Sequence, residues 1–190
     1  MTLYPKIRNI KKDNVALKIM IIISLLVSLL VFIINIITSK EHFWSLIVIM
    51  GILYAWITVM YSVYRNVNIG SSITVQFIAI SILTLCIDFI LGYRGWAINI
   101  AIPIIIITAN VTMLILTIVV LQRYYKYAIN QLIIFILSMI PLLILFLSKQ
   151  IITNKILVII SSSIALFTFI ISLILCGKNI IQELDRRLHM

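Results

Sequence analysis

Long apolar stretches alternate with short polar segments along the whole of this 190-residue chain. An apolar run of roughly 20 residues spans the hydrocarbon of a bilayer as a helix, which also satisfies its own backbone hydrogen bonds there. The pattern predicts six such helices, at 17–37, 43–64, 73–91, 96–121, 129–147 and 156–176. We therefore expect an all-α integral membrane protein with six transmembrane helices arranged as three helical hairpins.

Composition supports a membrane location, because 64% of the residues are hydrophobic and only 11% are charged. Too few polar residues remain to cover a water-facing surface. The first apolar run is longer than the core of a secretory signal and ends without a small-x-small cleavage site, so we expect a retained first span. The predicted organisation is a basic cytoplasmic segment at 1–16, a transmembrane domain at 17–176 and a cytoplasmic amphipathic tail at 177–190.

The distribution of Lys and Arg predicts the orientation. The side shared by both termini carries eleven of them, namely Lys6, Arg8, Lys11, Lys12, Lys18, Arg65, Arg123, Lys126, Lys178, Arg186 and Arg187, against Lys40, Arg94, Lys149 and Lys155 opposite. The positive-inside rule then places both termini in the cytoplasm, with the protein in the plasma membrane. The partner expected from the +10 charge is the anionic inner leaflet rather than nucleic acid. We expect lipid headgroup contacts at Lys6, Arg8, Lys11, Lys12, Arg123, Lys126, Arg186 and Arg187.

The tail from Gly177 to Met190 has apolar residues on one helical face and basic residues nearby. This pattern predicts an amphipathic helix lying on the inner membrane surface. A docking site for a cytoplasmic partner is the alternative.

Residues that could carry chemistry are kept apart by this topology. His42 is expected outside and His189 inside, and Cys86 and Cys176 are expected in opposite halves of the membrane. A shared metal ion and a disulfide are therefore both excluded. Catalytic triads, glycine-rich phosphate loops and the H-E-x-x-H pattern are missing. The sequence predicts no enzyme, no metal and no cofactor.

A weak parallel repeat links the first two expected hairpins. Trp44 opens the second helix and Trp96 the fourth, and a polar residue precedes each of them: Asn35 by nine residues and Asp88 by eight. The third hairpin keeps the length but lacks both the tryptophan and the buried polar group.

Four short motifs carry a resemblance to a known family. They are "FWSLIVIMGILYAW", the spacing D-x-x-x-G-x-x-x-W from Asp88 through Gly92 to Trp96, "AIP" at 101–103 and the closing "ELDRRLHM". Together they resemble domain of unknown function 6320, a family of small bacterial membrane proteins, over nearly the whole chain. The resemblance implies the membrane architecture and no activity. The cysteine-pair zinc ribbon that begins many such proteins is absent before Cys86, and the family's acidic groups in the first and fifth helices are replaced by Asn35 and Ser148.

Asp88 is expected about 6 Å below the outer turn, where an intramembrane acid costs less than at the centre. One interpretation is structural: Asp88 pairs with Arg94 across the "GYRG" turn or accepts hydrogen bonds from Asn35, Asn99 or Tyr93. The other groups Asn35, Asp88, Arg94 and Asn99 into an outer polar pocket for a cation, a proton or a small amine.

Two prolines predict helix kinks, Pro103 in the fourth helix and Pro141 in the fifth. We interpret each kink first as a feature of helix packing and second as a functional hinge. Asn110 and Thr112, near mid-membrane, are expected to join helices by hydrogen bonds, and the alternative is that they extend a polar path from the pocket.

Two classes of function follow. The first is a non-catalytic membrane scaffold or accessory subunit of a transport or sensing complex, with a membrane-protein partner or a homo-oligomer. The second is a small carrier or ligand sensor built around the Asp88 pocket. The shortage of central ionisable groups favours the first.

Overall fold

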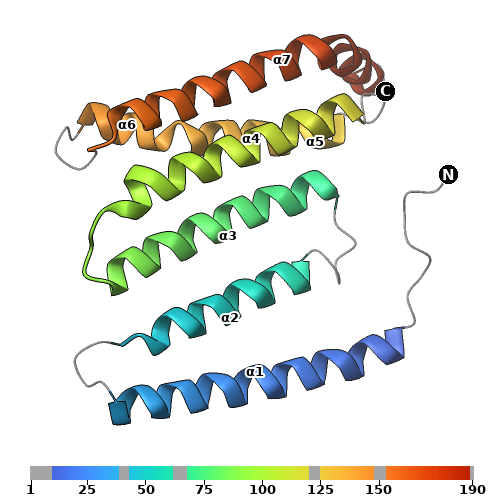
Figure 1. Ribbon diagram of the computed structural model, residues 1–190. Coiled ribbons are helices and arrows are strands. Elements are labelled where there is room, and N and C mark those ends of the chain that lie inside the picture. The colour runs from blue at the N-terminus through green and yellow to red at the C-terminus, as the bar shows by residue number, and fades with distance from the viewer. Residues whose placement is uncertain (1–9, 39–42, 62–67, 120–124, 148–152, 189–190) are drawn as a thin grey trace. The chain divides into compact units, whose positions relative to one another are not determined.

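The computed structural model describes residues 10–38, 43–61, 68–119, 125–147 and 153–188, and every regular element in these ranges is a helix (Figure 1). The chain divides into two compact units, Met1–Leu53 and Tyr54–Met190.

The first unit contains α1 (Ile10–Thr38) and the beginning of α2 (Ser45–Val59). The less exposed positions of α1 are Leu17, Ser24, Ser28, Val31 and Asn35, whose three- and four-residue steps form a single stripe. Large apolar side chains cover the rest of the helix and are exposed. Such an all-round apolar surface suits a helix that faces lipid.

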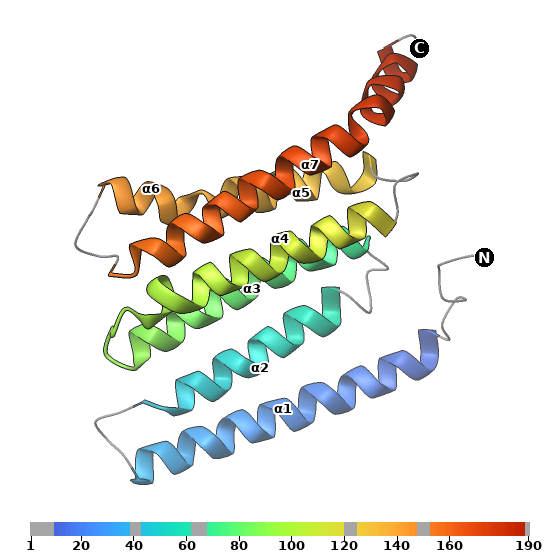
Figure 2. The same cartoon turned by 45° about the horizontal axis from the view of Figure 1, so that its top comes forward.

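The second unit contains α3 (Ile69–Ile90), the π-helical turn η2 (Ala97–Ala101), α4 (Ile102–Val119), α5 (Tyr125–Ser138), α6 (Ile140–Leu147) and α7 (Lys155–Leu188). α4 packs on α3, α5 and α7, and α5 packs on α3 and α7. These helices lie side by side in both views of the structure (Figures 1 and 2).

Buried residues of the second unit recur at steps of three and four on each helix. They include Gly70, Thr74 and Phe77 on α3, Pro103, Ile106, Asn110, Met113 and Thr117 on α4, Gln131, Ile134, Ser138 and Pro141 on α5 and α6, and Val158, Ser161, Ala165, Thr168 and Ser172 on α7. This spacing is the packing seam of left-handed helix bundles. An apolar cluster of Phe77, Ile106, Ala109, Met113, Ile134 and Ala165 forms its core.

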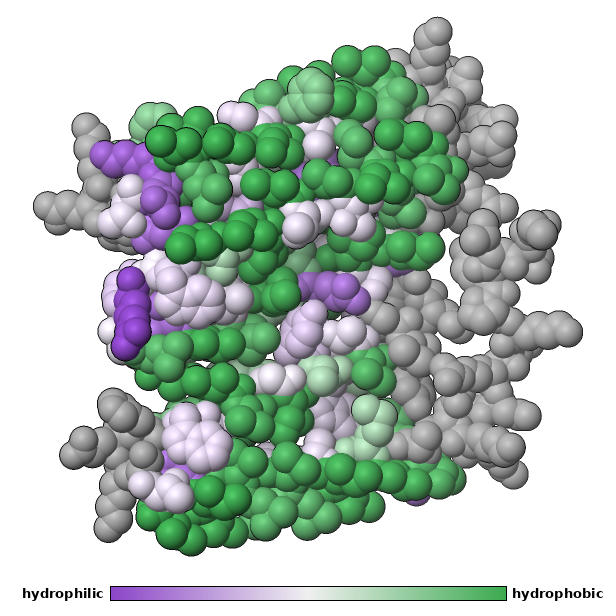
Figure 3. Space-filling view, viewed as in Figure 1, coloured by the Kyte–Doolittle hydropathy of each residue, from purple (hydrophilic) through white to green (hydrophobic). Residues whose placement is uncertain are grey.

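Apolar side chains dominate the outward surfaces of the helices, as the green areas of Figure 3 show. Five helices are long and apolar enough to cross a membrane: Leu17–Thr38, Ile69–Ile90, Ala97–Val119, Ile129–Leu147 and Lys155–Leu175. The expected span at 43–64 corresponds to α2, a shorter apolar helix of 15 residues.

Both prolines lie at irregularities of the helices that contain them. Pro103 is the second residue after η2, where the Ile102 N–H donates to the Ala97 carbonyl five residues earlier. A π turn of this kind rearranges the backbone groups that the missing proline N–H would leave unpaired. Pro141 follows the interruption between α5 and α6 at Met139, whose N–H is shared by the carbonyls of Phe135 and Ile136.

The last helix is the longest, because α7 continues without interruption for 34 residues to Leu188. At 1.5 Å per residue it measures about 51 Å, well beyond the roughly 30 Å of hydrocarbon. The backbone of the predicted tail is thus helical through Leu188, while its side chains lie outside the described part of the chain.

Candidate polar site at the Asp88 turn

The turn after α3 is formed by three residues with positive φ: Gly92 at 90°, Tyr93 at 53° and Gly95 at 75°. The Gly92 N–H donates to the Phe89 carbonyl and the Tyr93 N–H to the Asp88 carbonyl. This pair of bonds is the Schellman arrangement, in which a left-handed glycine reverses the chain after a helix. The glycines at 92 and 95 supply this conformation at no steric cost, whereas Tyr93 is strained.

Asp88 provides all the acceptors for three consecutive backbone N–H groups of this turn. Its carbonyl accepts from Tyr93 at 2.8 Å, its Oδ1 from Arg94 at 3.2 Å and its Oδ2 from Gly95 at 3.0 Å. The side chain is 1% exposed. An ionised carboxylate accepts hydrogen bonds and donates none, so it matches a cluster of N–H groups that point the same way.

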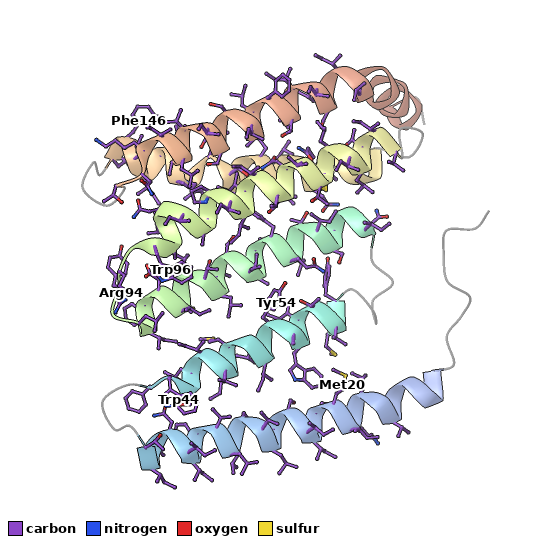
Figure 4. All side chains as sticks on the ribbon, in the orientation of Figure 1. Met20, Trp44, Tyr54, Arg94, Trp96 and Phe146 are labelled. Carbon is purple, nitrogen blue, oxygen red and sulfur yellow. The ribbon has the colours of Figure 1, made fainter. Side chains whose placement is uncertain are left out.

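The Arg94 contact with Asp88 is made by the backbone and not by the guanidinium, because the Arg94 side chain is exposed. Arg94 and Trp96 flank the turn at the end of the helices (Figure 4). Tyr93 is 58% exposed. The turn thus presents Tyr93 and Arg94 outward while the Asp88 carboxylate points inward to the backbone.

Gly95 connects Asp88 to Asn99. Its N–H donates to Asp88, and its carbonyl accepts from Asn99 Nδ2 at 2.7 Å. A Cβ added at Gly95 would lie 3.3 Å from that same Nδ2. Only a residue without a side chain combines this backbone conformation with this close approach.

Asn99 in turn joins the Asp88 turn to the start of α7. It is 7% exposed, and its Oδ1 accepts from the Thr153 N–H at 2.7 Å and the Asn154 N–H at 3.2 Å. One carboxamide therefore holds backbone from two connections that are far apart in sequence. We call Asp88, Gly95, Asn99, Thr153 and Asn154 the clamp.

Asn35 makes an equivalent bond in the first unit. It is buried, and its Oδ1 accepts from the Ser45 N–H at 2.9 Å at the start of α2. Of the four residues grouped by sequence, the structure connects Asp88, Arg94 and Asn99 through the turn, and places Asn35 in the other unit. Whether any of them binds a ligand stays a prediction.

Each of three connections thus has a buried side-chain oxygen that accepts backbone N–H groups near the start of the next helix. The oxygens belong to Asn35, Asp88 and Asn99. The sequence predicted this polar group for the first two connections and none for the third. In the structure Asn99 on η2 supplies it from 54 residues upstream of Thr153, a distance that no local spacing reveals.

A second polar group joins three helices within the core. Asn110 Nδ2 donates to Ser138 Oγ on α5 at 3.0 Å, and Asn110 Oδ1 accepts from Thr168 Oγ1 on α7 at 3.3 Å. All three side chains are buried. The expected role of Asn110 in joining helices is confirmed, whereas the hydroxyl of exposed Thr112 bonds its own helix at Thr108.

The described residues contain no group of three or more His, Cys, Asp or Glu that could hold a metal ion. Cys86 is a free, half-buried thiol. The predicted lipid contacts at Lys6, Arg8 and Arg123 lie outside the described residues, and so do the side chains of Lys11, Lys12, Lys126, Arg186 and Arg187.

Comparison with protein families identifies the chain over almost its full length. Residues 4–190 match the family of unknown function DUF6320. The chain belongs to this family. Searches of curated proteins and of solved structures found no match. The DUF6320 membership confirms the resemblance seen in the sequence motifs. The turn after α3 shows what one of these motifs does, because Asp88 and Gly92 of the D-x-x-x-G-x-x-x-W spacing build it.

Proposed function

We propose that the chain is a non-catalytic scaffold or accessory subunit of a transport or sensing complex in the plasma membrane. The observation that carries this proposal is the use of its buried polar groups. Asp88, Asn99 and Asn110 direct their side-chain oxygens to backbone N–H groups or to side chains of neighbouring helices. Groups engaged in this way hold helices together and have little capacity left for a substrate.

The order of polar and apolar residues along the core supports the same proposal. The Asn110 group lies between two apolar levels of the seam, one with Ile106 and Ala165 and one with Met113 and Ile134. A solute path is lined mainly by backbone carbonyls or by polar and charged side chains. Isolated polar levels instead fix the register of packed helices, as a buried Asn does in coiled coils.

The proposed topology has six spans in three hairpins, related by a weak parallel repeat, with both termini in the cytoplasm. It is supported by the five long apolar helices and by α2 as a sixth, shorter apolar helix. The hydrogen bonds at Ser45, Gly95 and Thr153, which close the connections between helices, support it as well. α2 would complete its span with the help of flanking residues or local thinning of the bilayer, as short helices do.

The alternative is a small carrier or sensor whose ligand binds near Asp88. One observation favours it: Tyr93 is held at a positive φ beside a buried acid, and backbone strain of this kind accumulates at binding sites. The ligand would have to displace the Arg94 and Gly95 N–H groups from the carboxylate.

An affinity purification distinguishes the two. Tagged wild-type protein and the Asp88→Asn and Arg94→Gln variants are extracted in mild detergent at matched expression. A stoichiometric membrane-protein partner that all three retain supports the accessory subunit. If no partner is found, and a cation or small amine raises the Tm of wild-type protein and of Arg94→Gln but not of Asp88→Asn, the scaffold proposal is wrong and the carrier takes its place.

A further inference from the structure

One buried side chain in the second unit has no hydrogen-bond partner at either of its polar atoms. Gln131 on α5 is 0% exposed, and neither Oε1 nor Nε2 contacts another polar atom of the structure. A dry, unpaired carboxamide inside a protein is costly, and natural proteins rarely leave one. None of the described residues provides a hydrogen-bond partner for it, so a group from outside the chain would remove this cost.

The level of Gln131 in the bundle follows from the Asn110 contacts. Asn110 touches Ser138 on α5, and Gln131 lies seven residues before Ser138 while Thr117 lies seven residues after Asn110. Since α4 and α5 run in opposite directions, both steps lead about 10 Å toward the end of the unit opposite the clamp. Gln131 and buried Thr117 therefore lie at a common level.

Two further helices bring small residues toward this level. Thr74 on α3 is buried and lies three residues before Phe77, which belongs to the same apolar cluster as Met113 and Ile134. Ser172 on α7 is buried and lies four residues beyond Thr168, the partner of Asn110. By this register Thr74 and Thr117 share the level of the Gln131 carboxamide, and Ser172 lies about one helical turn nearer to Asn110, so three short hydroxyl side chains provide polar groups in this part of the bundle.

The chemistry of these neighbours defines the guest. The Thr117 hydroxyl donates to the Met113 carbonyl and the Ser172 hydroxyl to the Thr168 carbonyl, so both still offer lone pairs as acceptors. Gln131 offers one acceptor oxygen and an NH₂ donor. The buried residues of this level carry no charge. A guest must therefore be small and neutral, and it must both donate and accept hydrogen bonds.

We propose that the level of Gln131 and Thr117 binds ordered water, which bridges the Gln131 carboxamide to nearby hydroxyl oxygens, that of Thr117 first. Water meets each requirement, and buried waters typically make about three hydrogen bonds to otherwise unsatisfied groups. The site lies outside the clamp, and the apolar core separates the two. It does not depend on the proposed function.

The test observes the Gln131 NH₂ group directly in the full chain in lipid nanodiscs. Side-chain amides are labelled with ¹⁵N at glutamine, and the Gln131 signal is assigned by its loss in Gln131→Met. We expect a cross-peak between this NH₂ and a long-lived water, weakened in Thr117→Val and unchanged in Gln76→Met, a half-buried glutamine on α3. An NH₂ signal that is protected from deuterium exchange and lacks any water cross-peak would overturn the proposal.

Thermal unfolding gives a second readout, which does not depend on the quality of the NMR spectra. Methionine has nearly the volume of glutamine without its polar groups. If water pairs the carboxamide, Gln131→Met loses those bonds and its Tm is at or below that of the wild type. A Tm above the wild type contradicts the proposal, because removing a dry unpaired amide is stabilising.

Discussion

Asp88 lies inside an apolar helix because three N–H groups of the next turn need acceptors in a place with little water. An unsatisfied backbone group in hydrocarbon costs several kcal/mol. The carboxylate oxygens and the Asp88 carbonyl satisfy the N–H groups of Tyr93, Arg94 and Gly95 together. The cost of one buried acid is thus offset by the bonds of a complete turn.

This role predicts the effect of Asp88→Asn. Asparagine keeps one acceptor oxygen but turns an NH₂ donor toward the N–H of Arg94 or Gly95. We expect the free energy of unfolding to fall by about 1–3 kcal/mol. Denaturant unfolding of the purified protein in detergent measures it, and an unchanged midpoint would contradict the bonding of the clamp.

Arg94→Gln is the matched control at the same turn. Only the backbone of Arg94 contacts Asp88, and its side chain is exposed. We expect a change within about 0.5 kcal/mol, as for other surface substitutions. A loss as large as that of Asp88→Asn would instead show an ion pair between the guanidinium and the carboxylate.

Gly95→Ala tests the conformation of the turn. A methyl group at φ 75° is strained, and it would approach Asn99 Nδ2 to 3.3 Å. We expect a loss of about 1–2 kcal/mol in the free energy of unfolding. Gly92→Ala, also at positive φ but with nothing within 4 Å, should lose less, and Gly51→Ala in open space within α2 should lose nothing. Equal losses at positions 95 and 92 would show that contact with Asn99 is unimportant.

The sequence predicted that Asp88 has a hydrogen-bond or charge partner, since an acid in an apolar run must have one. It did not predict which partner. Arg94 is the obvious counter-charge in a sequence, whereas the backbone N–H groups that the structure uses are present in any turn. Their convergence depends on Tyr93 taking a left-handed conformation, and tyrosine gives no sequence signal for it.

At the scale of the helices, the three- and four-residue steps of the buried residues set how the bundle packs. Thirteen polar or charged side chains are buried among the described residues against eight hydrophobic ones, so polar side chains are common in the seams around the apolar cluster. This is the reverse of a soluble core and agrees with packing in lipid, where small and polar residues hold helices together.

Asn110 provides the test of that packing. In a double-mutant cycle of Asn110→Ala and Ser138→Ala we expect a coupling of about 0.6 kcal/mol and at most about 1.7, the range of polar contacts between membrane helices. Asn110→Ala with Thr112→Ala should show none, because Thr112 is exposed and bonds its own helix. Purely additive effects at positions 110 and 138 would contradict the contact between α4 and α5.

Hydropathy located the long helices to within a few residues, because the thickness of the bilayer fixes the length of an apolar run. It was less accurate at the ends and interruptions. α2 is shorter than its apolar run, and the run at 129–147 is broken at Met139. These features depend on local hydrogen bonds, to which average hydropathy is insensitive.

For the whole molecule, the proposed topology predicts which residues face each side of the membrane. In a variant with Cys86 and Cys176 replaced by alanine, a membrane-impermeant maleimide should label Arg94→Cys in intact cells. It should label Arg187→Cys only after the membrane is opened. The opposite pattern would invert the orientation, and labelling of both in intact cells would require an even number of spans between them.

The bond between Asn99 and the start of α7 has a consequence for how the protein is made. Asp88 meets its partners six and seven residues later, so its turn closes almost as soon as it is synthesised. Asn99 must wait for Thr153, 54 residues further on, which takes roughly 3 to 11 s at 5–20 residues per second. During that interval its Oδ1 lacks the Thr153 and Asn154 N–H groups and can accept a hydrogen bond from a chaperone or an insertase. Substitutions at Asn99 should therefore slow the last stage of biogenesis and leave insertion of the earlier helices unchanged.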